Sequence, residues 1–563
     1  MGARHGGDTV IAEIREQGVE TMFTLSGGHV FPLYDAAVGE ERAGAAATGA
    51  RDVTGADADP RIVDVRHEQT AVFAAEATAR LTRRTGLAVL TAGPGVTNGV
   101  SGITTAHFNG SPVVVLGGRA PLGRWGAGAL QELDHPPLLA PVTKLAATAA
   151  GPDTLASDVA RAFATAAAPH RGPVFLDVHM DHLFGPAGRA RREPARPDPP
   201  VRPADPERLA GIASLLKGAR RPVLVLGSDV WMDGAEEAAR AFAEELRLPV
   251  VANGQGRGVL PAGHELLVTR ARRLAFGDAD LVIVAGAPLD FRLGYGSFGD
   301  GSAKVVHLAD APSQLATHVP TAGSAAGDLS LLFTDLAAAC AKAGVSPAFH
   351  ADWRESLRDA TCAAIAEDVE LLASDADPIH PLRIYGELSK VLDDDAVVIG
   401  DGGDFVSYAG RYVEPRRPGC WLDPGPYGCL GTGLGYAIAA RLARPSAQVV
   451  LLLGDGAAGL SLMDADSLVR HGLPVVMIVG NNGSWGLEKH PMRMLYGYDV
   501  AADLRPRCRY DEVVRALGGA GELVTRPDEI GPALRRAFAS GVPYLVNVVT
   551  DPDVAYPRTT TGV

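Results

Sequence analysis

The sequence contains few cysteines: five in 563 residues, with no Cys-x-x-Cys pair among them. This scarcity argues against a disulfide-stabilised extracellular protein and against a cysteine-based zinc cluster. The first twenty residues have the pattern of an amphipathic helix and lack the apolar core of a signal peptide. We therefore expect free thiols and a cytoplasmic location.

Long apolar runs and a basic excess are also missing. Because no run reaches 18 apolar residues, we expect no membrane-spanning helix. The net charge of −14 argues against nucleic acid as a partner, since a phosphate-binding surface needs a basic excess. A chain of 563 residues is too long for one hydrophobic core, and its length suggests about three domains.

Short apolar runs rich in β-branched residues alternate with helix-length segments along the whole chain. This alternation predicts an α/β protein with three doubly wound, parallel-sheet domains. Two breaks separate them: a Pro- and Arg-rich linker at 185–209 and a second break at 374–388. We expect domains at 1–185, 200–345 and 375–563, the first and last with five or six strands each. The nine clearest predicted strands are VVVLGG, PVFLDV, RPVLVLG, LPVVAN, ADLVIVAG, AKVVHLAD, DAVVIGDGG, QVVLLLGDG and PVVMIVGNN.

Two of these strands end in polar turns that carry a carboxylate and an amide. Asp455 and Asn482 lie 27 residues apart, which is the length of one strand–helix–strand crossover. The two side chains can therefore meet at one edge of a sheet, and hard oxygen ligands of this kind suit Mg²⁺. Glycines beside them would let backbone N–H groups approach a phosphate. Asp-Gly and Asn-Gly are also common turn dipeptides, but their joint spacing favours a metal–diphosphate site.

This pattern resembles the metal and diphosphate motif of thiamine diphosphate enzymes. The resemblance covers the whole chain and is strongest to the acetolactate synthase-like and benzaldehyde lyase-like branch. It implies an N-terminal pyrimidine-binding domain, a central domain and a C-terminal diphosphate-binding domain. The matching segments include FTLSGGHVFPLYDA (23–36), VRHEQTAVFAAE (65–76), LTAGPGVTNGVSG (90–102), LQELDH (130–135), GPYGCLGTGLGYAIAA (425–440) and NNGSWGLEKHPM (481–492).

Three residues are implied to act at the reacting carbon. Glu68 matches the glutamate that bonds the cofactor's aminopyrimidine; taken alone, its motif would favour a helix-start acid stabilised by the helix dipole. His29 could relay protons to the substrate oxygen, or it could be a loop histidine bonded to the backbone. Gln131 is implied to donate to the substrate carbonyl oxygen.

The resemblance also assigns the metal and cofactor contacts. The metal ligands would be the side chains of Asp455 and Asn482 and the carbonyl of Ser484. Leu430 would wedge between the cofactor rings, although core packing would explain it too, and the segment after Trp485 reads as a loop-like lid over the site. The implied cofactor-binding residues are Gly403, Asp404, Phe405, Gly428, Leu430, Gly454, Gly456, Ala457, Trp485 and Gly486.

In the family the two ends of the cofactor are held by different subunits, so the resemblance implies a homodimer or a homotetramer with active sites at the subunit interface. It implies thiamine diphosphate and Mg²⁺ as cofactors and a small-molecule 2-oxo acid or acyloin as substrate. Relatives hold FAD, ADP or nothing in the central domain. Segments 252–264 and 286–296 match the flavin-binding region of acetolactate synthases, so the resemblance allows FAD here.

The implied reaction is decarboxylation of a 2-oxo acid such as pyruvate, followed by ligation of the acyl carbanion to a second carbonyl, as in acetolactate synthase. The alternative is a benzaldehyde lyase-like or 2-hydroxyacyl-CoA lyase-like enzyme, which SGGH and SWG favour. The chain has AAGLSLMD after Gly456 and no Gln-Trp-Gln-type lid segment, which points to a specialised substrate. Because Glu68, Asp455 and Asn482 are all present, a silent homologue is disfavoured, and no convincing G-x-G-x-x-G turn supports a nicotinamide enzyme.

Overall fold

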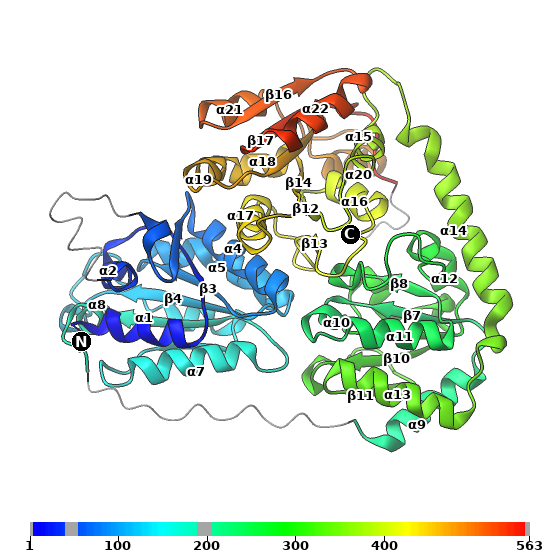
Figure 1. Ribbon diagram of the computed structural model, residues 1–563, viewed down its shortest axis with the longest axis horizontal. Helices are drawn as coiled ribbons and strands as arrows, with labels where there is room; N and C mark the ends of the chain where they lie inside the picture. The colour runs from blue at the N-terminus through cyan, green and yellow to red at the C-terminus, as the bar shows by residue number, and fades with distance from the viewer. Residues whose placement is uncertain (1–3, 40–53, 189–203, 558–563) are drawn as a thin grey trace.

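The computed structural model describes residues 4–39, 54–188 and 204–557. These residues form three bodies, each built on one parallel β-sheet with helices packed against it, as Figure 1 shows. The sheets have six, five and six strands in chain order. The predicted α/β class with three parallel sheets is confirmed, and so is the predicted size of the first and last sheets.

The first sheet has the strand order β2-β1-β3-β4-β6-β5. Its central strands are buried on both faces, because helices cover each side of the sheet, whereas the two edge strands are mostly half-buried. The strands are β1 (Thr21–Thr24), β2 (Arg61–Asp64), β3 (Gly86–Leu90), β4 (Val113–Arg119), β5 (Leu145–Thr148) and β6 (Val174–His179). The helices are α1 (Gly6–Glu16), α2 (Phe31–Val38), α4 (Glu68–Thr82), α5 (Pro94–Phe108), α6 (His135–Leu139), α7 (Leu155–Ala167) and α8 (Met180–Phe184).

The second sheet has the order β11-β10-β9-β7-β8 and forms the green body of Figure 1. Its strands are β7 (Pro222–Leu226), β8 (Val250–Ala252), β9 (Leu281–Ala285), β10 (Lys304–Ala309) and β11 (Gly323–Ala326). Its helices are α9 (Pro206–Gly218), α10 (Ser228–Met232), α11 (Glu236–Leu246), α12 (Arg272–Asp278) and α13 (Leu329–Ala343), and α14 (Ala351–Leu372) leads from it towards the third sheet.

The third sheet has the order β13-β12-β14-β15-β17-β16. Its strands are β12 (Val397–Asp401), β13 (Trp421–Leu422), β14 (Val449–Gly454), β15 (Val476–Asn481), β16 (Ala520–Val524) and β17 (Tyr544–Val549). Its helices are α15 (Leu382–Leu388), α16 (Asp404–Tyr412), α17 (Gly433–Ala443), α18 (Asp455–Ser461), α19 (Ala465–Arg470), α20 (Gly486–Tyr496), α21 (Tyr510–Ala516) and α22 (Pro527–Ala539).

All nine strands predicted from apolar runs are present, but some segments predicted as breaks are helical. Within the predicted linker, α9 already begins at Pro206, because Asp205 caps its first turn and proline suits a first helical position. Residues 189–203 of that linker lie outside the described part of the chain. In the second predicted break, Leu382–Leu388 forms α15, whose apolar side chains are buried against the third sheet.

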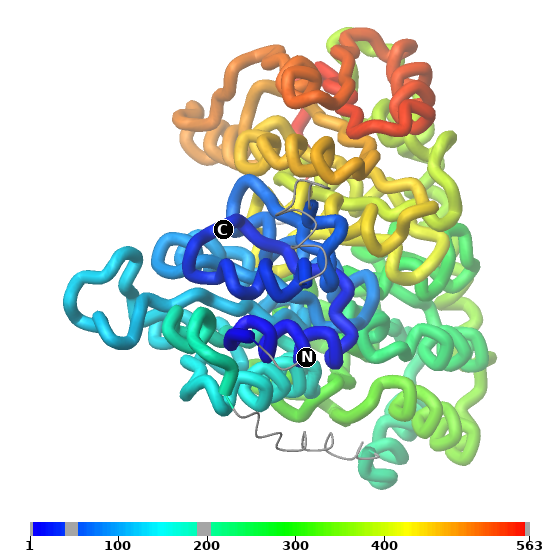
Figure 2. The backbone as a smooth tube through the Cα atoms, turned by 60° about the vertical axis from the view of Figure 1, so that its left-hand side comes forward, coloured from blue at the N-terminus to red at the C-terminus, as the bar shows by residue number. Residues whose placement is uncertain are grey.

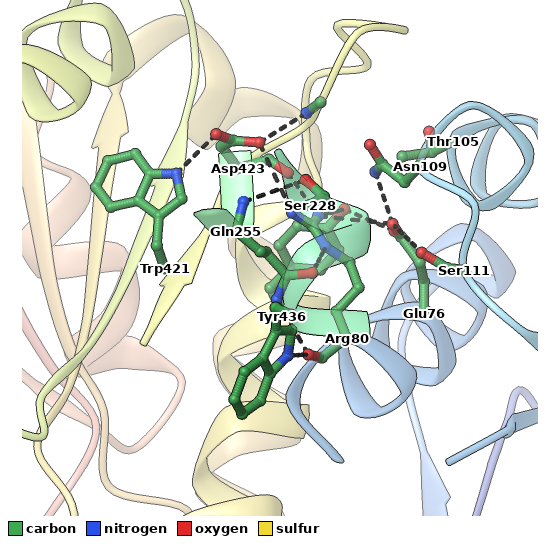
Figure 3. Close-up of polar contacts among 12 residues, drawn as sticks. Glu76, Arg80, Thr105, Asn109, Ser111, Ser228, Gln255, Trp421, Asp423 and Tyr436 are labelled. Atoms are coloured by element: carbon green, nitrogen blue, oxygen red, sulfur yellow. Dashed lines mark hydrogen bonds and ion pairs between the residues drawn. The ribbon is translucent and has the colours of Figure 1, made fainter. Parts of the chain in front are cut away.

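A buried polar network joins the three bodies at one point (Figure 3). The guanidinium of Arg80 on α4 donates to the carbonyl of Asp423 (2.7 Å) and to the hydroxyl of Tyr436 (3.3 Å) in the third body. The carbonyl of the same residue accepts bonds from Trp231 (2.6 Å) and Gln255 (3.0 Å) of the second body. The arrangement satisfies a fully buried cation, which would otherwise carry a large desolvation cost.

Among the described residues, no single helix is long and apolar enough to cross a membrane. The pair Leu329–Ala343 and Pro347–Leu372, bent by 98°, meets the length and composition test together. Buried core helices meet the same test, and α13 packs its apolar face into the core of the second body.

Candidate functional site

The carboxyl ends of β14 and β15 open onto a cavity in the third body. The two strands are hydrogen-bonded neighbours in parallel register, with Gly454 opposite Gly480. The predicted crossover is therefore confirmed, and it brings Asp455 and Asn482 to the same cavity. Eleven of the predicted site residues line this cavity: Gly403, Asp404, Phe405, Gly454, Asp455, Gly456, Ala457, Asn482, Ser484, Trp485 and Gly486.

Asp455 is the buried acid of the cavity, with 3% of its surface exposed. Its two carboxylate oxygens accept bonds from the backbone N–H groups of Gly456 (3.1 Å) and Gly483 (2.8 Å). Burial raises the pKa of Asp455 to about 6 in spite of these bonds. A cation beside this carboxylate would restore its ionised form, so the residue suits a metal ligand.

Two further oxygens support a cation at this point. The side-chain oxygen of Asn482 accepts a bond from the backbone N–H of Ser484 (3.1 Å), which fixes the amide at the strand end. The hydroxyl of Ser484 is buried and has no hydrogen-bond partner among the described residues. Asp455, Asn482 and Ser484 line one cavity, and carboxylate, amide and other protein oxygens of this kind are the ligands that fit Mg²⁺.

Helix starts and glycines shape the rest of the cavity. Helix α16 begins at Asp404 after Gly403, and α20 begins at Gly486, so the unpaired N–H groups of both first turns border the space. A side chain at Gly480 would collide with the ring of Phe405, since its Cβ would lie 2.5 Å away. N–H groups converging on a glycine-lined space fit a diphosphate.

Trp485 lies in this same cavity, as do the other predicted cofactor-binding residues of the third body named above. Its ring covers Gly456 so closely that a Cβ there would lie 2.5 Å from the indole. Glycine at 456 is therefore required by the tryptophan, and the contact places Trp485 among the cofactor-binding candidates.

Glu68 is the first residue of α4 in the first body and is 6% exposed. Its carboxylate accepts a bond from the side-chain amide of Asn98 (3.0 Å). His67 caps the helix by accepting from the N–H of Gln69, so Glu68 is not needed as a cap. No role for Asn98 was predicted from the sequence. Its position one turn into α5, after the Gly-Pro-Gly segment, could have indicated one.

His29 and Gln131 line a second cavity, which belongs to the first body alone. His29 Nδ1 bonds the hydroxyl of Thr91 (3.1 Å), and burial lowers its pKa, which favours the neutral imidazole. Gln131 has a positive φ of 60°, a strained conformation for a residue with a side chain. It lies in the loop after β4, which extends away from the rest of the chain (Figure 2) and exposes 79% of Leu130.

These two cavities remain separate in the single chain. The cavity of Asp455 is lined only by residues 381–554, and that of His29 only by residues 26–184. Glu68, Gly428 and Leu430 line neither of them. The single chain thus carries two separate cavities, one beside the buried acid Asp455 and one beside the neutral imidazole of His29.

The loop with Gly428 and Leu430 is held by an acid that the sequence analysis missed. Asp401, at the end of β12, is fully buried and accepts bonds from the N–H groups of Gly431 (3.1 Å) and Gly433 (2.8 Å). Burial raises its pKa to about 6. The position of Asp401 at a strand end could have predicted this role. From the sequence, only the following residues, beginning with Gly403, were assigned to cofactor binding.

The segment after Trp485 was predicted to be loop-like, and that prediction is wrong for its first half. Residues Gly486–Tyr496 form helix α20, even though Pro491 lies inside it. The ammonium of Lys489 pairs with Asp503 (2.6 Å), which ties the helix to the following segment. The far end of α20 and the residues after it expose apolar side chains, at Met494, Leu495, Tyr496, Tyr498 and Val500.

A third cavity lies at the carboxyl ends of the second sheet, where the three bodies meet. It is lined by the carboxylates of Asp229 and Asp423 and by His170, with Asp310 directly behind His170. Its guanidinium, Arg292, is held by both oxygens of Asp290. The lining thus offers a dinucleotide diphosphate two carboxylates and one guanidinium that is already paired, which is a poor fit for FAD.

Comparison with known proteins agrees with this geometry. Three family models match successive parts of the chain: the N-terminal TPP (thiamine pyrophosphate) binding domain over residues 4–138, the central domain over 209–336 and the C-terminal TPP binding domain over 401–548. The acetolactate synthase large subunit IlvG of Mycobacterium tuberculosis is 49% identical over 558 residues, covering 98% of this chain and 97% of the relative.

More distant relatives carry another name. The 2-hydroxyacyl-CoA lyase 2 of Caenorhabditis elegans is 34% identical and covers 92% of this chain and 84% of its own. The human protein of that name is 32% identical, with 97% and 90% covered. Three matching domains and near-complete coverage of a relative of almost half-identical sequence show that the chain belongs to the thiamine pyrophosphate enzymes and is acetolactate synthase-like.

Proposed function

We propose that this enzyme decarboxylates a 2-oxo acid such as pyruvate and ligates the resulting acyl unit to a second carbonyl, as an acetolactate synthase does. The observation that carries the proposal is the cavity of Asp455, where a buried acid, an amide and two helix starts lie together. The 49% identity to an acetolactate synthase large subunit supports the choice of reaction.

When bound, thiamine diphosphate supplies the electron sink for breaking and making a bond beside a carbonyl carbon. Glu68 would hold a proton at the aminopyrimidine nitrogen, since it is buried and already accepts one amide bond. His29, neutral because of its burial, would exchange a proton with the substrate oxygen. Gln131 would orient that oxygen by donating from its amide.

We further propose that Mg²⁺ is held by the side chains of Asp455 and Asn482 and by the carbonyl of Ser484. The N–H groups near Gly403, Asp404 and Phe405 would hold the diphosphate. Leu430 would bend the cofactor, with the Gly428 carbonyl on its amino group, in the loop that Asp401 fixes.

The separation of the Asp455 and His29 cavities supports a homodimer at least. In such a dimer, the first body of one chain would complete the active site on the third body of its partner. The exposed apolar end of α20 and the extended loop after β4 are surfaces that such a partner would cover. Whether dimers pair into tetramers stays a prediction, as do the domain bounds 1–185, 200–345 and 375–563 and the cytoplasmic location.

The flavin allowed by the resemblance is not part of the proposal, because two carboxylates line the central cavity and its one guanidinium is already paired with Asp290. A second candidate function, cleavage of a 2-hydroxyacyl-CoA, is favoured by the relatives at 34% and 32% identity. We rank it second because those relatives are less similar than the acetolactate synthase.

The test is purified protein with thiamine diphosphate, Mg²⁺ and pyruvate, assayed for CO₂ and acetolactate. We expect both products from the wild type and a loss of roughly 100-fold or more in Glu68→Gln, as for a removed proton-transfer group. Glu237→Gln, the same change at an exposed helix position, should keep full activity. No acetolactate from wild type that binds the cofactor would refute pyruvate as donor, and 2-hydroxyacyl-CoA thioesters would be tried next.

A further inference from the structure

A cluster of three metal-ligating side chains, which the proposed reaction does not use, borders the central cavity: two of its members line the cavity and Asp310 lies behind them. His170 comes from the segment between α7 and β6, Asp229 from α10 after β7, and Asp310 follows β10. One ligand atom of each lies within 4.8 Å of the others. Two of the three come from the carboxyl ends of parallel strands, the edge where such sheets bind ligands.

Asp229 is the member of the cluster whose carboxylate lacks a hydrogen-bond donor among the described residues. It is 9% exposed and lines the cavity, and its carboxylate accepts no hydrogen bond from any described residue. Burial and the neighbouring Asp310 both raise its pKa. His170 and Arg171 offset part of its charge without donating a hydrogen bond to it, so the carboxylate can take a ligand from the cavity.

The neighbouring cations are already engaged elsewhere. Arg171 donates to Asp233 at 2.5 Å and stays 4.0 Å from Asp310. Lys144 donates to the carbonyl of Ala168. His170 Nδ1 lies 2.9 Å from Asp310, so the imidazole is aimed into the cluster and could hold either a proton or a metal there.

We infer that His170, Asp229 and Asp310 bind one divalent transition-metal ion, which would link the first body to the second. Ligands around Zn²⁺ or Mn²⁺ lie about 3 to 4 Å apart, so the cluster closes on such an ion with shifts of about 1 Å or less. One imidazole and two carboxylates favour these ions over Mg²⁺, which prefers oxygen ligands and water. This inference does not depend on which substrate the enzyme uses.

The test uses full-length protein stripped with a chelator and kept free of thiamine diphosphate. Zn²⁺ and Mn²⁺ are each titrated by calorimetry, and bound metal is counted by elemental analysis after gel filtration. We expect one ion per chain, bound at least tenfold more weakly by Asp229→Asn and by His170→Gln. Asp229→Asn should also melt no lower than wild type without metal, since it removes an unpaired carboxylate.

Two variants serve as controls. Asp233→Asn makes the same change one turn along from Asp229 but leaves the three ligands, so it should keep the ion. Asp455→Asn removes the proposed Mg²⁺ ligand of the third body, and this variant should also retain the ion at the His170 cluster. The inference is overturned if wild type takes up no stoichiometric ion, if uptake survives both cluster variants, or if Asp455→Asn abolishes it; the first outcome would assign the cluster to a protonated His170.

Discussion

The cavities of the second and third sheets have the same origin but opposite chemistry. Each lies at the carboxyl ends of parallel strands next to a buried aspartate. Asp455 is held by two backbone N–H groups, whereas Asp229 receives no such bond from the described residues. The comparison shows that strand-end geometry provides a place for a ligand, while the surrounding N–H groups and carboxylates decide which ligand is accepted.

The largest effect should come from the third-sheet cavity. Asp455→Asn removes the charge that a cation requires, so Mg²⁺-dependent binding of thiamine diphosphate should weaken by about 100-fold or more. Fluorescence titration of the cofactor at fixed Mg²⁺ would measure this. If Asp455→Asn bound thiamine diphosphate as tightly as wild type, Asp455 would not be the cation ligand that distinguishes this cavity from that of the second sheet.

The predicted and the missed parts of this site differ in how local they are. Strands β14 and β15 were predictable because each is an apolar run ending in a polar turn. Strand β13, with two residues, and β16, which begins Ala-Gly-Glu, have too little apolar pattern to be found. Helix α20 was missed because Gly486 and Pro491 disfavour helix, and its pairing with Asp503 is not visible in a local pattern.

Roles that depend on partners distant in sequence were equally hidden. Asp401 holds N–H groups 30 and 32 residues away, and Glu68 meets Asn98 30 residues away. The cluster of His170, Asp229 and Asp310 spans two sheets, and no spacing rule of a single motif connects them. The sequence therefore yields residues at strand ends, and the fold decides which of them meet.

A second prediction compares a satisfied buried acid with an unsatisfied one. Asp401→Asn replaces an acceptor of two N–H bonds, so we expect the free energy of unfolding to fall by about 1–3 kcal/mol. Asp229→Asn, without metal, should not lower it. Urea unfolding of both variants measures the two changes. Equal losses of unfolding free energy would contradict the prediction.

A third prediction concerns pH. Because Asp455 has a pKa of about 6, protons compete with Mg²⁺ below that value, and cofactor affinity at pH 5 should be about tenfold lower than at pH 7. In the metal-free protein the sign for stability is reversed. Folding raises this pKa from 3.8, so the folded chain binds more protons and its free energy of unfolding falls as pH rises from about 4 to 6. An affinity that does not change between pH 5 and pH 7 would contradict this assignment.

The smallest expected effect tests the exclusion of nucleotides from the second-sheet cavity. Wild type should bind ADP and FAD weakly, and Asp229→Asn should improve ADP affinity by about fivefold, since it removes about 1 kcal/mol of charge repulsion. Calorimetry on protein freed of metal by a chelator measures the two ADP affinities. A yellow protein purified with stoichiometric FAD would contradict the exclusion directly.

Arg80 has a consequence for how such chains can be recombined. Its guanidinium bonds the third body and its carbonyl bonds the second, so a single residue of the first body contacts both others. A chimera that took its central segment from a relative without matches to Trp231 and Gln255 would leave that buried carbonyl unpaired. Successful exchange of one segment would therefore require moving Arg80 together with its partners in the other two bodies.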